Sequence, residues 1–155
     1  MRKTFHFAVF GITVLLGDMQ ASAAERGLLA EYSGNKISKA SVHTHVDARV
    51  DFDWTAAPPI PEIKGGEFSV RWHGRVEPEL SGTHTFYLTG GEGCRLWIHG
   101  NLLINKFNDG GGTRSGQFDL VAGKTCEITL EYHGKAGIGL ARLEWECHAK
   151  SGLGR

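Results

Sequence analysis

The stretch "FYLTGGEGCRLWIHG", residues Phe86–Gly100, decides the fold class. On both sides of the loop Gly90–Gly93, apolar and polar residues alternate, and this period of two is that of a β-strand with one buried face. The loop itself combines three glycines with one carboxylate, Glu92. Such a loop either turns the chain between two strands or holds a ligand.

The same alternation continues through the chain from Phe68 to Cys147, and helical spacing is hard to find there. Glycine steps such as Gly82-Thr83 and Gly100-Asn101 suit tight turns, because glycine adopts positive φ without a steric penalty. The predicted strands are "FSVRWHGRV", "THTFYL", "CRLWIHG", "NLLINKF", "SGQFDLV", "CEITLEYH" and "LARLEWEC", with "AERGLLAEYSG" as an opening strand. We therefore predict an all-β fold, an antiparallel β-sandwich or barrel.

The N-terminus has the features of a signal peptide. Arg2 and Lys3 precede "FHFAVFGITVLLG", which is too short to span a bilayer, and small residues end at Ala23. We expect residues 1–23 to be a signal peptide, 24–149 one domain and 150–155 a tail, with the proline-rich "APPIPEI" as a crossover inside the domain. The chain is thus expected to be secreted, to the periplasm or the extracellular space.

Without residues 1–23 the chain has one more acidic than basic residue, so a polycationic nucleic-acid-binding surface is not expected. No second hydrophobic run predicts a membrane anchor in the mature chain.

Three cysteines cannot all pair with each other, so one should be free or intermolecular. If the "HGKAGIG" loop closes a hairpin, Cys126 falls opposite Cys147, and the apolar residues of both segments share one face. We predict a Cys126–Cys147 disulfide that stabilises the fold by about 2 to 4 kcal/mol, provided that the pair sits at a non-hydrogen-bonded position. Cys94 shares a face with apolar residues and is expected to be buried.

The order of motifs resembles a PA14 domain. The matching segments are "GLLAEYSG", "FDW", "FSVRWHGRVEPELSGTHTFYLT", "GCRLWIHGNLLI" and "LEYHGKAGIGLARLEWE", which cover about Gly27 to Glu146. The resemblance implies a β-sandwich found in secreted proteins, often beside glycosidases, adhesins and toxins. Several such domains bind carbohydrate, and others act as assembly modules.

The resemblance also implies a place for calcium. In the carbohydrate-binding members, two consecutive aspartates before the "GxRLWI" strand hold the ion, and the matching positions here are Gly91 and Glu92. Calcium takes six to eight oxygen ligands, so the loss of one carboxylate should weaken the site severely. Glu92 is then either a weak metal or hydroxyl ligand or a solvated carboxylate on a turn, and we expect no cofactor.

A second loop, "NKFNDGGGTRSG", offers polar groups and one aromatic ring. Its ligand-binding candidates are Asn105, Phe107, Asn108 and Asp109. Sugar binding needs such a mixture, because hydroxyls must be paired while the ring packs on an aromatic side chain. Asn-Asp-Gly is equally common as turn chemistry.

His43 and His45 should point to one face of a strand, where they could bind a transition metal, although a polar strand face is the commoner arrangement. The four tryptophans are expected in the core, and the remaining histidines of the mature chain at the surface or rim.

The function expected first is a secreted, non-catalytic module that binds a glycan or cell-surface polysaccharide. A module that docks an extracellular protein partner, with Cys94 as an intermolecular thiol if exposed, is the alternative. No G-x-S-x-G, H-E-x-x-H or phosphate-loop motif supports an enzyme, and a glycoside hydrolase is the weakest hypothesis.

Overall fold

The computed structural model describes residues 26–34, 43–63, 66–107 and 110–149. This part of the chain contains ten strands and no helix, and thus no helix that is long and apolar enough to cross a membrane. The strands are β1 (Leu28–Ser33), β2 (His43–Asp47), β3 (Asp51–Trp54), β4 (Glu67–Val76), β5 (Gly82–Gly90), β6 (Gly93–Ile98), β7 (Asn101–Asn105), β8 (Thr113–Leu120), β9 (Cys126–Lys135) and β10 (Gly139–Ala149). The expected signal peptide and tail lie outside the described residues.

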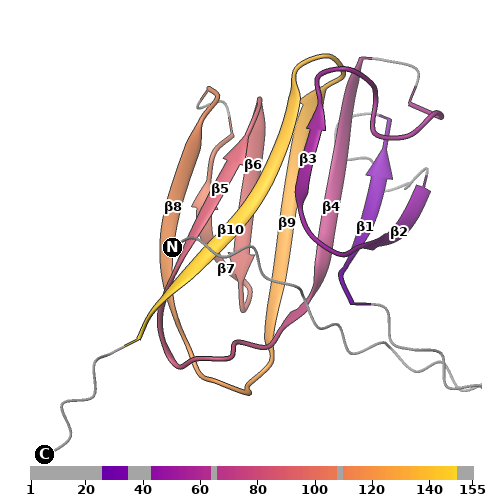
Figure 1. Ribbon diagram of the computed structural model, residues 1–155. Helices are drawn as coiled ribbons and strands as arrows, with labels where there is room; N and C mark the ends of the chain where they lie inside the picture. Colours follow the sequence, from indigo (N-terminus) through magenta and orange to yellow (C-terminus); the bar gives the residue numbers. More distant parts are fainter. Residues whose placement is uncertain (1–25, 35–42, 64–65, 108–109, 150–155) are drawn as a thin grey trace, which may run out of the picture.

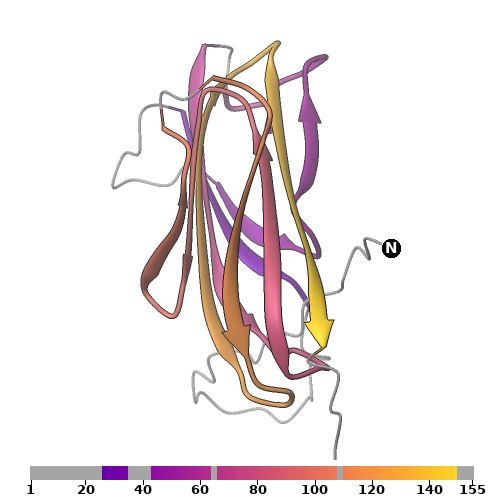
Figure 2. The same cartoon turned by 90° about the vertical axis from the view of Figure 1, so that its left-hand side faces the viewer.

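The strands form two antiparallel sheets, as Figure 1 shows face-on and Figure 2 from the side. One sheet has six strands in the order β2-β1-β4-β9-β6-β7, and the other has four in the order β3-β10-β5-β8. The prediction of an all-β antiparallel sandwich is confirmed.

The core lies between the two sheets and is aromatic at its centre. Trp54 and Trp72 stack with ring centroids 6.3 Å apart, and Phe68 meets Trp54 edge-on at 5.1 Å. All three side chains are buried, at no more than 6% exposure. Inward-facing residues of both sheets alternate with outward polar ones, so the pattern read from the sequence is what builds the core.

The loop between β5 and β6 turns the chain from one sheet to the other rather than closing a hairpin. β5 belongs to the four-stranded sheet and β6 to the six-stranded sheet. Gly90 has no room for a side chain, since an added Cβ would lie 2.5 Å from Cys94 Sγ. Gly91 fixes the crossing by donating its N–H to the Leu140 carbonyl at 3.2 Å. Two alternating segments around a loop are expected both for a hairpin and for a crossing between sheets. Only the pairing of the strands shows which of the two is present.

The predicted hairpin between Cys126 and Cys147 is wrong. β9 and β10 diverge from their connecting loop into different sheets (Figure 1), where β9 pairs with β4 and β6, and β10 with β5 and β3. Cys126 therefore lies opposite Val76, and Cys147 opposite His84. Both strands turn an apolar face to the same core, so alternation alone does not distinguish hairpin partners from partners across a sandwich. Cys94, Cys126 and Cys147 are all free in the structure, which does not show the predicted disulfide.

Candidate functional site

Several of the predicted binding residues meet at one end of the sandwich, which we call the glycine-loop end. Gly91 and Glu92 form the β5–β6 crossing, and Asn105 ends β7 directly opposite Arg95. Glu92 and Asn105 are exposed, and Phe107 is half-buried. Asn108 and Asp109 lie outside the described residues.

Phe107 is not the bare apolar platform that the sequence suggests. A Cβ added to Gly93 would lie 3.3 Å from three atoms of the Phe107 ring, so the ring packs against a glycine. The guanidinium carbon of Arg95 lies 4.0 Å from the ring centroid, within the range of a cation–π interaction. His133 lies nearly parallel to the ring at 6.4 Å. The polar group over the Phe107 ring is thus a partly buried guanidinium, whose Nη1 also lies 3.9 Å from Glu131 Oε2.

Lys106 is the residue at this end that sequence reasoning missed. Its side chain is completely buried, and its ammonium Nζ donates to the carbonyl oxygens of Gly90, at 3.2 Å, and Gly110. Its backbone N–H donates to the Cys94 carbonyl at 2.8 Å. The alternation along β7 puts Ile104 on the inward face, and two residues later it predicts that Lys106 also faces the core. One ammonium therefore fastens the β5–β6 crossing to the segment that leads into β8.

The calcium site implied by the resemblance does not fit these residues. Gly91 supplies no side-chain oxygen, and the Gly90 and Gly110 carbonyls, which could otherwise ligate a cation, already accept from the Lys106 ammonium. Among the described residues, no group of three or more histidine, cysteine or acidic side chains could hold a metal ion. An internal cation holds the loops together here.

Two groups beneath the crossing are kept neutral by burial. Burial raises the pKa of the Cys94 thiol to about 11, against an opposite effect of the Lys106 ammonium. Burial is also the main cause that raises the pKa of Tyr132 to about 12. Cys94 is 1% exposed, so the expectation that it is buried is confirmed, and it offers no thiol for an intermolecular bridge.

The His43–His45 pair lies on one strand face as expected, with ring centroids 5.2 Å apart. Its neighbour is the buried Asp47, whose Oδ1 lies 2.7 Å from His45 Nε2. Asp47 Oδ2 accepts from the Tyr32 hydroxyl at 2.9 Å and from Trp72 Nε1 at 2.7 Å. We call this set the Asp47 cluster. Because the carboxylate already has three partners, the cluster anchors β2 to the core.

Some burial expectations were wrong. Trp97 shares the outward face of β6 with Arg95 and is only partly buried, whereas His84 and His133 are buried, at 3% and 9% exposure. His133 is held by Ser69, whose Oγ lies 3.2 Å from Nδ1. The alternation of β6 predicts the outward face of Trp97, but the motif that contains it suggested the core.

Comparisons with known proteins agree with this architecture. The family model described as PA14 domain matches residues 24–152. The Anti-sigma-I factor RsgI3 of Acetivibrio thermocellus is 39% identical over 120 residues, which cover 77% of this chain and 19% of that protein. A solved anti-sigma factor domain-containing protein from Clostridium clariflavum is 38% identical with a TM-score of 0.74, over 78% of this chain and 42% of that one.

A solved PA14 sugar-binding domain from an RTX adhesin has a TM-score of 0.62 at 18% identity, over 78% of this chain and 89% of that one, which shows the shared fold. The chain spans less than two thirds of the RsgI3 and Clostridium proteins. With the family model matching most of its length, the chain belongs to the PA14 domain family.

Proposed function

We propose that this chain is a secreted, non-catalytic carbohydrate-binding module that works without calcium, and that the glycine-loop end contacts the glycan. The observation that carries the proposal is the buried Lys106 ammonium, which joins Gly90 to Gly110. Loops held in place before binding lose little conformational entropy when a ligand arrives. The PA14 domain of the RTX adhesin, which shares this fold, is a sugar-binding domain, and this supports the ligand class.

The polar groups that reach the surface at this end suit sugar hydroxyls. Arg95 presents donors from a guanidinium supported by the Phe107 ring, and Glu92 presents an exposed acceptor. The Asn105 Oδ1 accepts from the Phe107 N–H at 3.3 Å, which orients the amide. A hydroxyl both donates and accepts, so a mixed set of this kind can pair with it.

A glycan array with the purified chain tests the proposal. We expect the same glycans to be bound in calcium and in chelator, and Arg95→Ala to reduce the signal about tenfold or more, because hydrogen bonds to charged groups are lost. Arg49→Ala, which removes an exposed arginine between β2 and β3, is the matched control and should leave the signal unchanged. Binding that requires calcium contradicts the metal-free mechanism, and no binding in either condition contradicts the function.

A second candidate function is an interaction module within a larger protein or complex. Two observations favour it: the chain covers only 19% of the anti-sigma factor that it matches, and Trp97 lies opposite Leu102, which is 50% exposed. Crosslinking and pulldown with the native partner proteins, comparing the wild type with Leu102→Ser, should then show a complex that the variant loses. A monomer that captures nothing would exclude this role.

A further inference from the structure

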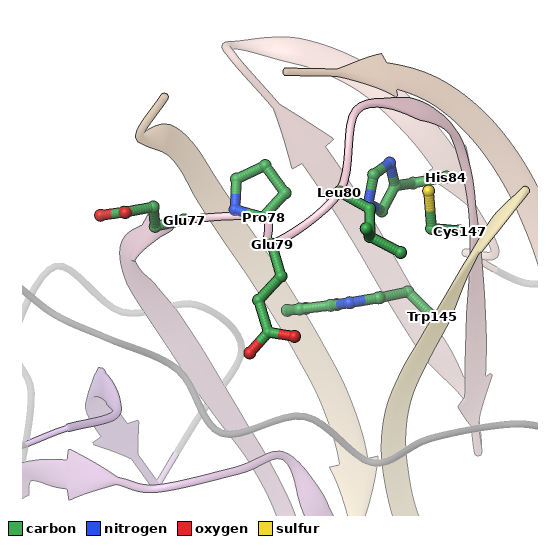
Figure 3. A pocket seen from close by; sticks show the side chains of 7 residues that line it. All are labelled: Glu77, Pro78, Glu79, Leu80, His84, Trp145 and Cys147. Carbon is green, nitrogen blue, oxygen red and sulfur yellow. The ribbon is translucent and has the colours of Figure 1, made fainter. Parts of the chain in front are cut away.

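A hollow lies at the opposite end of the sandwich from the glycine loops, and we call it the Trp145 pocket (Figure 3). One wall is the β4–β5 loop with Glu77, Glu79 and Leu80, and the other is made by Trp145 of β10 and His84 of β5. β5 begins beside this pocket and ends at the glycine loops. At about 3.3 Å per residue, the two ends are on the order of 20 Å apart.

The rim of the pocket is fixed by backbone hydrogen bonds. The Pro78 carbonyl accepts from the Gly123 N–H at 3.0 Å, and the Ser81 hydroxyl oxygen accepts from the Ala122 N–H at 2.9 Å. The β4–β5 loop is thereby tied to the β8–β9 loop. The backbone that carries Glu77 and Glu79 is therefore fixed beside the pocket before any ligand arrives.

The pocket has an apolar wall that a flat ring could pack on. Trp145 is half-buried and lies against Phe86 with centroids 5.5 Å apart and planes tilted by 60°, which fixes the indole orientation. Leu80 is 55% exposed at the pocket mouth. Indole faces are suited to the C–H face of a sugar ring, because both are apolar and nearly flat.

Besides the Trp145 indole N–H, the pocket offers acceptors. Glu77 and Glu79 are exposed carboxylates, and no lysine or arginine is among the described residues that line the hollow. His84 is buried at 3% exposure, and its Nδ1 donates to the Gly82 carbonyl at 3.0 Å, because a carbonyl oxygen can only accept. The pocket therefore favours a ligand with hydroxyl donors and disfavours one with a carboxylate.

From this combination we infer that the Trp145 pocket is a second carbohydrate subsite that takes one neutral pyranose unit, stacked on Trp145 with a hydroxyl donated to Glu79, while Glu77 adds negative charge at the rim. The inference rests on the proposed carbohydrate-binding function but uses none of its residues. An acidic sugar such as a uronate is repelled by the two carboxylates. A domain with subsites at both ends contacts two stretches of polysaccharide.

The test is a titration of the ¹⁵N-labelled chain with methyl β-glucopyranoside and, separately, with methyl β-glucuronide. We expect the neutral glycoside to shift the Trp145 indole N–H signal, assigned with Trp145→Phe, in a saturable way, and the glucuronide to bind about tenfold more weakly. Glu77→Gln/Glu79→Gln should remove that difference. Glu62→Gln, an exposed glutamate in the β3–β4 connector, is the matched control and should keep it.

A second measurement uses the native thiols. Cys147 is a partly buried residue lining the pocket, whereas Cys94 and Cys126 are each 1% exposed. The neutral glycoside should slow alkylation of Cys147 at least threefold, with the two buried thiols as internal references. If the chain binds glycans on the array but neither glycoside shifts the Trp145 signal or protects Cys147, the subsite is wrong and the proposed function still stands. Equal binding of both glycosides also overturns it.

Discussion

At the scale of single residues, Lys106 shows how one buried side chain joins two loops. An ammonium carries its charge on a covalent tether, so it needs no free metal and releases none. Its hydrogen bonds to Gly90 and Gly110 join segments twenty residues apart in the sequence.

Lys106→Met tests this role, because methionine keeps the length and apolar stem and removes only the ammonium. Two carbonyls then lose their hydrogen-bond donor, which destabilises the fold, while removal of a buried charge stabilises it. The first effect is the larger, so we expect the free energy of unfolding to fall by about 1 to 3 kcal/mol. Urea denaturation gives the value. Lys124→Met, at an exposed lysine between β8 and β9, should change it by less than about 0.5 kcal/mol. A Lys106→Met protein as stable as the wild type contradicts the assignment.

Cys94 makes stability depend on alkaline pH. Its pKa rises from 9.0 to about 11 on burial, so the folded state holds the proton more tightly than the unfolded state. That contribution is complete below pH 9 and is lost as pH rises to about 11, because unfolding then releases a proton. Between pH 9 and about 11 we expect the free energy of unfolding to fall by about 2 to 3 kcal/mol, measured by urea denaturation under reducing conditions.

The control for this pH effect is Cys94→Ala, which has no thiol to titrate. Its unfolding free energy is lower than that of the wild type at neutral pH but should fall less steeply above pH 9. The remaining slope comes from other buried groups whose pKa is raised, Cys126, Tyr32 and Tyr132. Equal slopes for the wild type and the variant would show that the Cys94 thiol is not the responsible group.

At the scale of elements, β2 is an edge strand that depends on the Asp47 cluster. β2 has a single partner, β1, so its attachment to the core rests on few contacts. Asp47 supplies a carboxylate at 7% exposure that reaches Tyr32 of β1 and Trp72 of β4. One side chain thus links three neighbouring strands.

Asp47→Asn keeps the shape of the side chain and replaces one acceptor oxygen with a donor. The Tyr32 hydroxyl and the Trp72 N–H then donate to a neutral amide oxygen instead of a carboxylate, and these bonds are weaker, so we expect a loss of about 1 to 3 kcal/mol of stability and faster amide exchange in β1 and β2. Asp119→Asn is the matched control, since Asp119 accepts a single exposed hydrogen bond from Thr83 at 2.6 Å. Unchanged exchange in β2 would show that the strand is held by other contacts.

The sequence predicted the strands correctly but not which strands pair with each other. The alternation around Gly90–Gly93 gives both flanking strands, and the glycine step at Gly100, with φ of 74°, is the turn of the β6–β7 hairpin. Strand pairing did not follow. The face of Cys126 and the face of Cys147 are both apolar, and a period of two contains no information on which partner lies beside a strand.

For the whole molecule, the sequence predicts which residues cluster at the glycine-loop end, because successive strands return to the same end of a sandwich. It did not predict the cation that holds that end, since a lysine is normally expected in solvent. The Trp145 pocket was missed for another reason. Its lining comes from segments more than sixty residues apart, the β4–β5 loop and β10, and they meet only through the pairing of β10 with β5.

The two ends of the sandwich should act independently. They are joined by strands whose side chains fill the space between the sheets, and sites this far apart with no shared partner normally show additive effects, within about 0.5 kcal/mol. Arg95→Ala should therefore change the apparent Kd of the Trp145 pocket for methyl β-glucopyranoside less than about twofold. The same ¹⁵N titration, repeated on this variant, measures it. A larger change would mean that the glycine loops and the pocket share a conformational equilibrium, in which case the preorganisation assigned to Lys106 would be incomplete.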